Sequence, residues 1–260
     1  MLHEPKPSAV LKASTPIAPL LVGVATLLAS FAGPIHVAQA TQAPFPCDST
    51  IKSSDFVATI DNPYFPLRPG TTLTYQGTQD GVPARDVFRV TTNTKTILGV
   101  RTTEVSDRLT VADALAEDTL DWFAQDTVGN VWYFGEDTKE LDRNGNVIST
   151  QGSWQAGKNG AKPGIVMLAS PQVGDTYQQG CAPGVAEDTA RVVSLTKTVK
   201  VPCGSFTNVL QTEETTPLDP TDVGQKYYAQ GFGVILDLAK KGGRERFELV
   251  SAQGGAKSCP

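Results

Sequence analysis

Hydrophobic and polar positions alternate along most of the chain after residue 60. These segments are rich in Thr, Val, Tyr and Phe, and turn-forming pairs such as Asp80-Gly81 and Gly242-Gly243 recur between them. No window shows a sustained 3.6-residue hydrophobic period, which a surface helix requires. The pattern therefore predicts an all-β fold, in which antiparallel meanders form a half-barrel or a sandwich. Asn144-Gly145, between two strand-like segments, predicts a hairpin with a two-residue loop.

The first forty residues differ from the rest of the chain. An apolar run at 17–31 follows Lys6 and Lys12, and Ala38-Gln39-Ala40 supplies small residues at the end of the segment. This arrangement predicts a signal peptide at 1–40 and a mature N-terminus at Thr41. A membrane anchor is the alternative, but the run is short and lacks a basic stop-transfer flank. We therefore expect a secreted or periplasmic protein with no stable membrane anchor after cleavage.

Two stretches of the remaining chain resemble each other. RVTTNTKT at 89–96 is followed by WFAQ at 122–125, and RVVSLTKT at 191–198 is followed by YYAQ at 227–230. Chance is the alternative, because Thr-rich strands match easily. The ordered matches predict a duplicated β unit. We therefore predict an irregular segment at 41–60, a first β half at 61–152, a connection at 153–170 and a second β half at 171–260.

The charge and the histidines exclude several classes of function. The whole chain has a formal charge of −5, and removing Lys6, Lys12 and Glu4 with the signal peptide changes it to −6. An acidic protein is disfavoured as a partner of nucleic acid or of anionic membranes. Both histidines, His3 and His36, lie in the signal segment. The mature chain therefore lacks a Ser-His-Asp triad and histidine metal ligands, and we predict no cofactor and no metal.

All four cysteines lie in the predicted mature chain, at Cys47, Cys181, Cys203 and Cys259. An even number in an exported chain predicts two disulfides. Three pairings are possible, and we expect Cys181–Cys203, which closes a medium loop, together with Cys47–Cys259, which joins the two ends. A four-thiolate metal site is the rival interpretation, but it lacks a C-x-x-C spacing.

Residues 117–137, EDTLDWFAQDTVGNVWYFGED, combine six carboxylates with five aromatic side chains. A hairpin with a three-residue loop around Gly129 would pair Trp122 with Phe134, Phe123 with Tyr133 and Ala124 with Trp132. A two-residue loop would instead place Asp121 opposite Glu136, where like charges repel. We predict the first register.

The aromatic framework of this hairpin is shared by both halves, but its acids are not. Lys226, Gly231 and Lys241 stand at the positions of the second half that correspond to Asp121, Asp126 and Glu136. Solvated strand ends are the simplest interpretation of the acids. The alternatives are a calcium site, a carboxylate pair for sugar hydrolysis and ligand recognition on tryptophan surfaces. The candidate ligand-binding residues are Trp122, Trp132, Trp154, Asp121, Asp126 and Glu136. Trp154, in a Gly-rich segment, is the tryptophan that we expect to be exposed.

Three segments resemble those of a known group of proteins. IDNPYFPLRPGTTLTYQG at 60–77, DWFAQDTVGNVWYFGED at 121–137 and YYAQGFGVILDL at 227–238 are similar to the hallmark segments of a family of secreted bacterial all-β proteins of unassigned activity. The resemblance covers about 60–250 and implies no catalytic residue. Gly-Phe-Gly-Val at 231–234 also resembles the last strands of LolA-like half-barrels, which implies a lipid or acyl-chain ligand.

The sequence thus predicts a non-enzymatic protein that binds a small-molecule, lipid or glycan ligand outside the cytoplasm. A carboxylate-dependent hydrolase acting on a glycan is the alternative, and a passive envelope component is a third possibility. A cleft with two converging carboxyl groups would favour the hydrolase, and an apolar trough would favour a lipid-binding protein.

Overall fold

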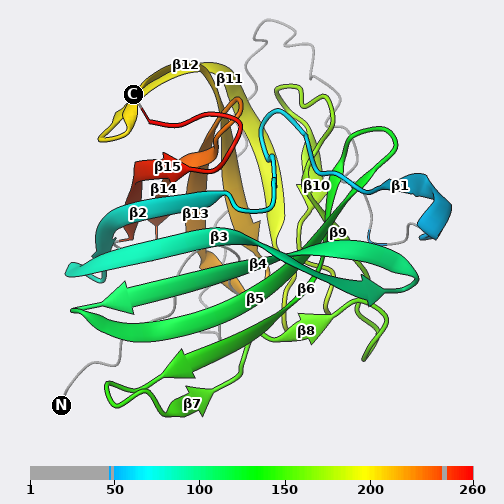
Figure 1. The fold of residues 1–260 in the computed structure, drawn as a ribbon, viewed down its shortest axis with the longest axis horizontal. Coiled ribbons are helices and arrows are strands. Elements are labelled where there is room, and N and C mark those ends of the chain that lie inside the picture. The colour runs from blue at the N-terminus through cyan, green and yellow to red at the C-terminus, as the bar shows by residue number, and fades with distance from the viewer. Residues whose placement is uncertain (1–46, 48–49, 242–244, 260) are drawn as a thin grey trace, which may run out of the picture.

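A computed structural model describes Cys47, residues 50–241 and residues 245–259 (Figure 1). The regular secondary structure in these ranges is all strand, as predicted, apart from one 3-10 turn, η1 (Ser53–Asp55), and contains no α-helix. None of these residues forms a helix long and apolar enough to cross a membrane. The predicted signal peptide at 1–40 and the N-terminus at Thr41 lie outside the described residues.

The described residues form fifteen strands, most of them in long antiparallel hairpins. Their bounds are β1 (Phe56–Val57), β2 (Thr72–Gln79), β3 (Val82–Ile97), β4 (Val100–Val111), β5 (Ala114–Asp126), β6 (Val131–Leu141), β7 (Val147–Ser149), β8 (Trp154–Gln155), β9 (Gly164–Met167), β10 (Thr176–Gln178), β11 (Thr189–Val201), β12 (Gly204–Thr216), β13 (Asp219–Ala229), β14 (Gly233–Lys241) and β15 (Arg246–Gln253).

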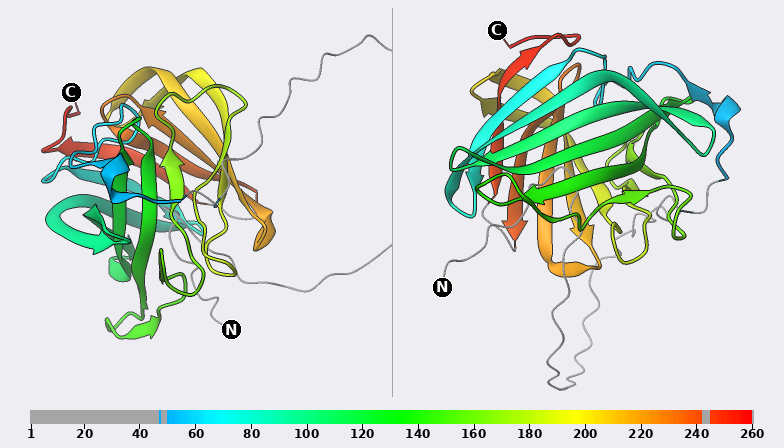
Figure 2. Two further views of the ribbon diagram at one scale, coloured as in Figure 1. Left: turned by 90° about the vertical axis from the view of Figure 1, so that its right-hand side faces the viewer. Right: turned by 60° about the horizontal axis from the view of Figure 1, so that its bottom comes forward.

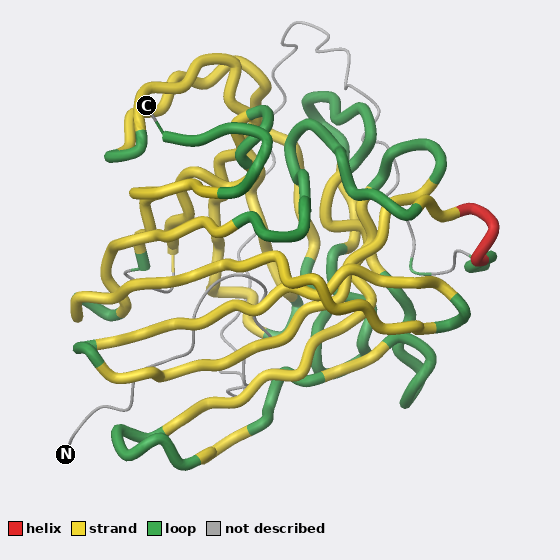
Figure 3. The backbone as a smooth tube through the Cα atoms, viewed as in Figure 1, coloured by secondary structure: helices red, strands yellow, loops and turns green. Residues whose placement is uncertain are grey.

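All the strands belong to one antiparallel sheet, which is not closed. Its order is β10-β11-β12-β13-β14-β15-β2-β3-β4-β5-β6-β7, and β1, β8 and β9 pair with β5 or β6 beside this path. The sheet curves so strongly that β2–β6 form a front layer that crosses β11–β13 behind it (Figures 1 and 2). Loops gather at the strand ends (Figure 3). A continuous apolar core fills the concave side, and its largest fully buried side chains include Phe123, Tyr133, Tyr177 and Tyr228.

The two halves of the chain contain meanders of the same order. In β2–β6 and again in β10–β14, each strand pairs with the next one along the chain. Trp122 and Tyr227 both lie on the fourth strand of their meander, β5 and β13. This order is what a duplication requires, and the duplication itself stays a prediction. The segment predicted as a connection at 153–170 contains β8 and β9, which pair with β6.

The β5–β6 hairpin has the predicted three-residue loop, but the predicted register holds only near the turn. Phe123 pairs with Tyr133, as expected. Beyond that pair the register shifts, and Asp121 lies opposite Glu136. The expected pairing of Trp122 with Phe134 is therefore wrong.

Gly135 explains the shift in register. It has a φ of 129°, which L side chains rarely adopt, and a Cβ at this position would lie 2.3 Å from the carbonyl oxygen of Trp154. The bulge thus lets the backbone of β8 approach β6 closely. The prediction assumed an unbroken ladder between β5 and β6, and the approach of β8 breaks that assumption.

The hairpin at Asn144-Gly145 also has a three-residue loop, not the predicted two-residue loop. The backbone N–H of Asp142 donates to the carbonyl of Asn146 at 2.9 Å, and the Asp142 carboxylate accepts the N–H groups of Asn144 and Asn146. The β5–β6 loop has the same pattern, since DTVGN at 126–130 and DRNGN at 142–146 share their Asp, Gly and last Asn. The aspartate side chain thus selects this turn.

The chain has two disulfides and no free cysteine, but the predicted pairing is wrong. Cys47 bonds to Cys181 and Cys203 bonds to Cys259, with Cα–Cα distances of 5.8 and 5.0 Å. β11, with 13 residues, runs between Cys181 and Cys203, and an extended strand of that length spans about 40 Å. Cys203 lies instead beside β15, since its N–H donates to Leu249. Sequence proximity was therefore misleading.

Candidate functional site

Three of the six predicted ligand-binding residues line one cleft. Trp122, Glu136 and Trp154 contribute to a cleft of ≈ 330 Å³ at the place where β8 pairs with β6. Its other lining residues come from β3, from β6, from the segment around β8 and from the loop that follows β10: Lys95, Asp137, Ser153, Gln155, Lys158, Asn159, Ala161, Ala182, Pro183 and Val185. Trp132, Asp121 and Asp126 do not line it.

Trp154 is buried, contrary to the expectation of an exposed ring. Only 7% of the residue is accessible, and its ring packs edge-on against Tyr133 with centroids 5.2 Å apart. Its Nε1 donates to Oε1 of Glu136 at 3.2 Å. The Gly-rich composition around Trp154 led to the wrong expectation, because this segment pairs with β6 as β8.

Trp122 carries a cation on its ring. Nζ of Lys95 lies 3.3 Å from the ring centroid, a cation–π geometry in which the ring quadrupole attracts the ammonium. The indole Nε1 is buried and donates to no acceptor among the described residues. Partial burial, followed by repulsion from Lys158, lowers the pKa of Lys95.

Asp121 and Glu136 are buried, so the expectation of solvated strand ends is wrong for both. Burial is the main cause that raises the pKa of each carboxyl well above its usual range, and the Asp121 charge raises the pKa of Glu136 further. The Tyr133 hydroxyl donates to Oδ1 of Asp121 at 2.6 Å, and the Thr138 hydroxyl donates to Oε2 of Glu136 at 2.6 Å. A raised pKa favours the neutral form of each acid, which weakens the charge repulsion that had argued against this pairing.

Asp126 organises the β5–β6 turn. Its Oδ1 accepts the N–H groups of Val128, Gly129 and Asn130, and its Oδ2 accepts Asn130 Nδ2 and Trp132 Nε1. The Trp132 ring packs edge-on against Phe56, with centroids 6.1 Å apart. Asp126 is thus a half-buried residue that caps the turn, and Trp132 has a structural environment, while ligand binding by either stays a prediction.

The Asp121–Glu136 pair is not placed for sugar hydrolysis. Glycosidases place two carboxyl groups on either side of the scissile bond. Glu136 and the next residue, Asp137, line the cleft, but Asp121 does not. The Tyr133 hydroxyl also occupies one oxygen of Asp121. In the described ranges there is also no group of three or more His, Cys, Asp or Glu residues that could hold a metal ion.

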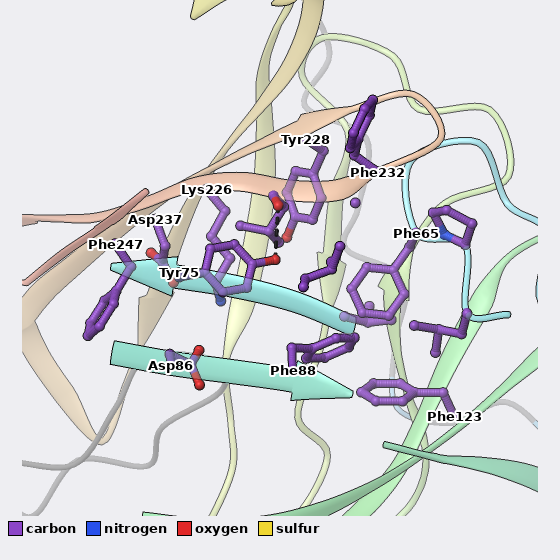
Figure 4. A pocket seen from close by; sticks show the side chains of 16 residues that line it. Phe65, Tyr75, Asp86, Phe88, Phe123, Lys226, Tyr228, Phe232, Asp237 and Phe247 are labelled. Carbon is purple, nitrogen blue, oxygen red and sulfur yellow. Dashed lines mark hydrogen bonds between the residues drawn. The ribbon is translucent and has the colours of Figure 1, made fainter. Parts of the chain in front are cut away.

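A second cavity lies inside the curved sheet, between the front and rear layers. Phe65, Phe88 and Phe123 gather at one end, and Asp86 and Asp237 lie toward the other (Figure 4). The cavity measures ≈ 40 Å³, which is room for about three water molecules. It is therefore too small for an acyl chain.

The polar end of this cavity contains a buried ion pair. Nζ of Lys226, on β13, lies 2.6 Å from Oε2 of Glu214 on β12. Oδ1 of Asp86 is buried with no hydrogen-bond partner among the described residues. Sequence reasoning missed this cavity, since its aromatic residues read as ordinary core positions of separate strands.

Sequence reasoning also missed Lys95 and Lys158 in the larger cleft, which are 63 positions apart and meet only through the approach of β8 to the sheet.

Comparison with known proteins identifies no family. No family model and no curated protein matches the sequence. A solved structure described as a putative lipoprotein from Parabacteroides distasonis ATCC 8503 aligns with 74% of this chain and 99% of its own, with a TM-score of 0.39 and 9% sequence identity. A likeness this distant carries no argument about function.

Proposed function

We propose that the protein is a non-enzymatic extracytoplasmic binding protein, and that the cleft between Trp122 and Trp154 takes a glycan ligand. The observation that carries this proposal is the cleft itself. Its volume of ≈ 330 Å³ falls within the range of about 300–1,000 Å³ typical of small-molecule sites. Two indole rings and several polar side chains line it, and a sugar has both apolar ring faces and hydroxyl groups to meet them.

Two features support the extracytoplasmic part of the proposal. All four cysteines form disulfides, and structural disulfides persist in oxidising compartments but are rare in the cytosol. The predicted signal peptide points to the same location.

A glycan is favoured over a lipid by the relative size of the two cavities. The apolar cavity inside the sheet measures ≈ 40 Å³, so it offers no trough for an acyl chain. Binding is favoured over hydrolysis because Asp121 does not line the cleft, and the two carboxyl groups that do, Glu136 and Asp137, follow each other on β6. A glycosidase needs its two carboxyl groups on either side of the scissile bond.

The test is isothermal titration of the protein with soluble oligosaccharides of neutral and uronic sugars, at millimolar concentration. We expect saturable binding, and Gln155→Ala, which trims a cleft side chain, to weaken it severalfold. Gln172→Ala is the matched control, because Gln172 is exposed and outside the cleft. Binding that Gln155→Ala leaves unchanged, or no binding to any oligosaccharide, would contradict the proposal. Shortened oligosaccharides after incubation would show a hydrolase instead.

A further inference from the structure

The cleft holds two lysines with no described counter-ion. Lys95 on β3 and Lys158 after β8 both line it, and neither forms an ion pair with a described residue. Burial first, and then repulsion from Lys158, lowers the pKa of Lys95. In a chain with a formal charge of −5, the two lysines are a local concentration of positive charge.

The acidic residues of the cleft balance these lysines only in part, since Asp137 attracts Lys95. Glu136 is held by hydrogen bonds from Thr138 and Trp154, and burial favours its neutral form. Asp137 lies 3.7 Å from Nζ of Lys139, so it already has a cationic neighbour. With Glu136 in its neutral form, the two lysines outnumber Asp137, the remaining carboxylate of the cleft lining.

A neutral donor accompanies the two cations. The Nε1–H of Trp122 is buried and lacks an acceptor among the described residues. Buried donors are almost always paired in native proteins, and an unpaired donor calls for an explanation such as an absent ligand. Nζ of Lys95 sits 3.3 Å above the same ring, and an anionic oxygen bonded to it at about 2.8 Å would lie close to the indole.

We propose that the cleft contains an anion subsite, in which a carboxylate or sulfate group of the ligand pairs with Lys95 and Lys158 and accepts a hydrogen bond from Trp122. The glycan part of this inference rests on the proposed function, whereas the anion subsite rests on the two lysines and the indole donor. The ligand class is thus an acidic glycan, either a uronic-acid oligomer or a sulfated one. Lys158 is exposed on its loop, and its long side chain is free to close over the anion.

The experiment compares each acidic glycan with a neutral form of the same backbone. Titration calorimetry would use an oligogalacturonate with its methyl ester, and a sulfated disaccharide with its desulfated form. We expect the preferred acid to bind at least tenfold more tightly than its neutral counterpart. Lys95→Gln and Lys158→Gln should each reduce that affinity about tenfold or more, as for the loss of a charge-assisted contact. Lys197→Gln is the control, because it removes the same charge from an exposed site on β11.

A second measurement detects the anion subsite without any glycan. In the nitrogen-15 NMR spectrum, inorganic sulfate should shift the Trp122 indole resonance, assigned from its loss in Trp122→Phe. Lys158→Gln should abolish the shift, and this exposed position keeps the test valid if Lys95→Gln fails to fold.

The two measurements separate the inference from the proposed function. Equal affinity for acidic and neutral glycans would overturn the anion subsite and leave the glycan cleft standing. A sulfate-dependent indole shift with no oligosaccharide binding would support the subsite and refute the glycan ligand. No response in either measurement would refute both.

Discussion

Replacing Asp126 by asparagine should destabilise the protein strongly, although the sequence alone pointed to a harmless surface change. Five hydrogen bonds end on the Asp126 carboxylate, three from backbone N–H groups and two from the side chains of Asn130 and Trp132. An asparagine preserves the three backbone bonds through its carbonyl oxygen. Its amide NH₂ would then face Asn130 Nδ2 and Trp132 Nε1, so that donors oppose donors.

The magnitude follows from the two lost bonds. Hydrogen bonds to a charged group contribute about 1.5–3 kcal/mol each, and Asp126 is only half-buried, so the low end of that range applies. Losing both should lower the free energy of unfolding by about 3 kcal/mol. For a chain of this size that corresponds to a fall in Tm of about 6–12 °C.

The assay is urea denaturation of Asp126→Asn alongside Asp142→Asn, which is the matched control. Asp142 caps a loop of the same D-x-x-G-N pattern and accepts Asn146 Nδ2 at 3.0 Å, but it is at the surface and bonds no tryptophan. We expect a much smaller shift for the control. Equal, small shifts for both variants would refute the claim that the bond to Trp132 anchors this hairpin.

Two further predictions concern the buried acids and the bulge. Burial is the main cause that raises the pKa of Asp86 to about 6 and that of Asp188 to about 7. The folded state therefore holds more protons than the unfolded state between about pH 4 and 7. The free energy of unfolding is therefore greatest at mildly acidic pH, and this extra stability is lost as pH rises through the folded pKa values. The urea midpoint should fall from pH 5 to pH 8, by less in Asp188→Asn, and a midpoint that rises with pH would contradict this. Gly135→Ala should displace β8, because the added Cβ would lie 2.3 Å from the Trp154 carbonyl oxygen. The substitution should also reduce Tm by several degrees or more. A variant whose near-ultraviolet circular dichroism is unchanged from the parent would contradict this prediction.

Local chemistry in the sequence was enough to predict the fold class. Alternation with period 2 places successive side chains on opposite faces of a strand, and this property depends only on neighbours in the chain. The same holds for the β5–β6 turn, where Asp126 and Gly129 direct a three-residue loop and thereby the nearby pairing of Phe123 with Tyr133. The even number of cysteines likewise predicted that two disulfides would form.

Only the tertiary structure decided which distant segments meet. Cys181 and Cys203 are close in sequence but are separated by the length of β11, so each bonds to a cysteine brought near by the curvature of the sheet. Nothing local predicts that curvature, because it accumulates from the twist of many paired strands.

The candidate site was likewise predicted only in part from the sequence. The sequence identified Trp122, Trp154 and Glu136 as chemistry-bearing residues, but assigned Trp154 to the surface and Glu136 to a solvated strand end. Their burial follows from the approach of β8 to Gly135, which covers this part of β6 and also brings Lys158 to the cleft. Burial, and the protonation that it favours, depends on segments that are far apart in the sequence, and for that reason it emerged only with the folded chain.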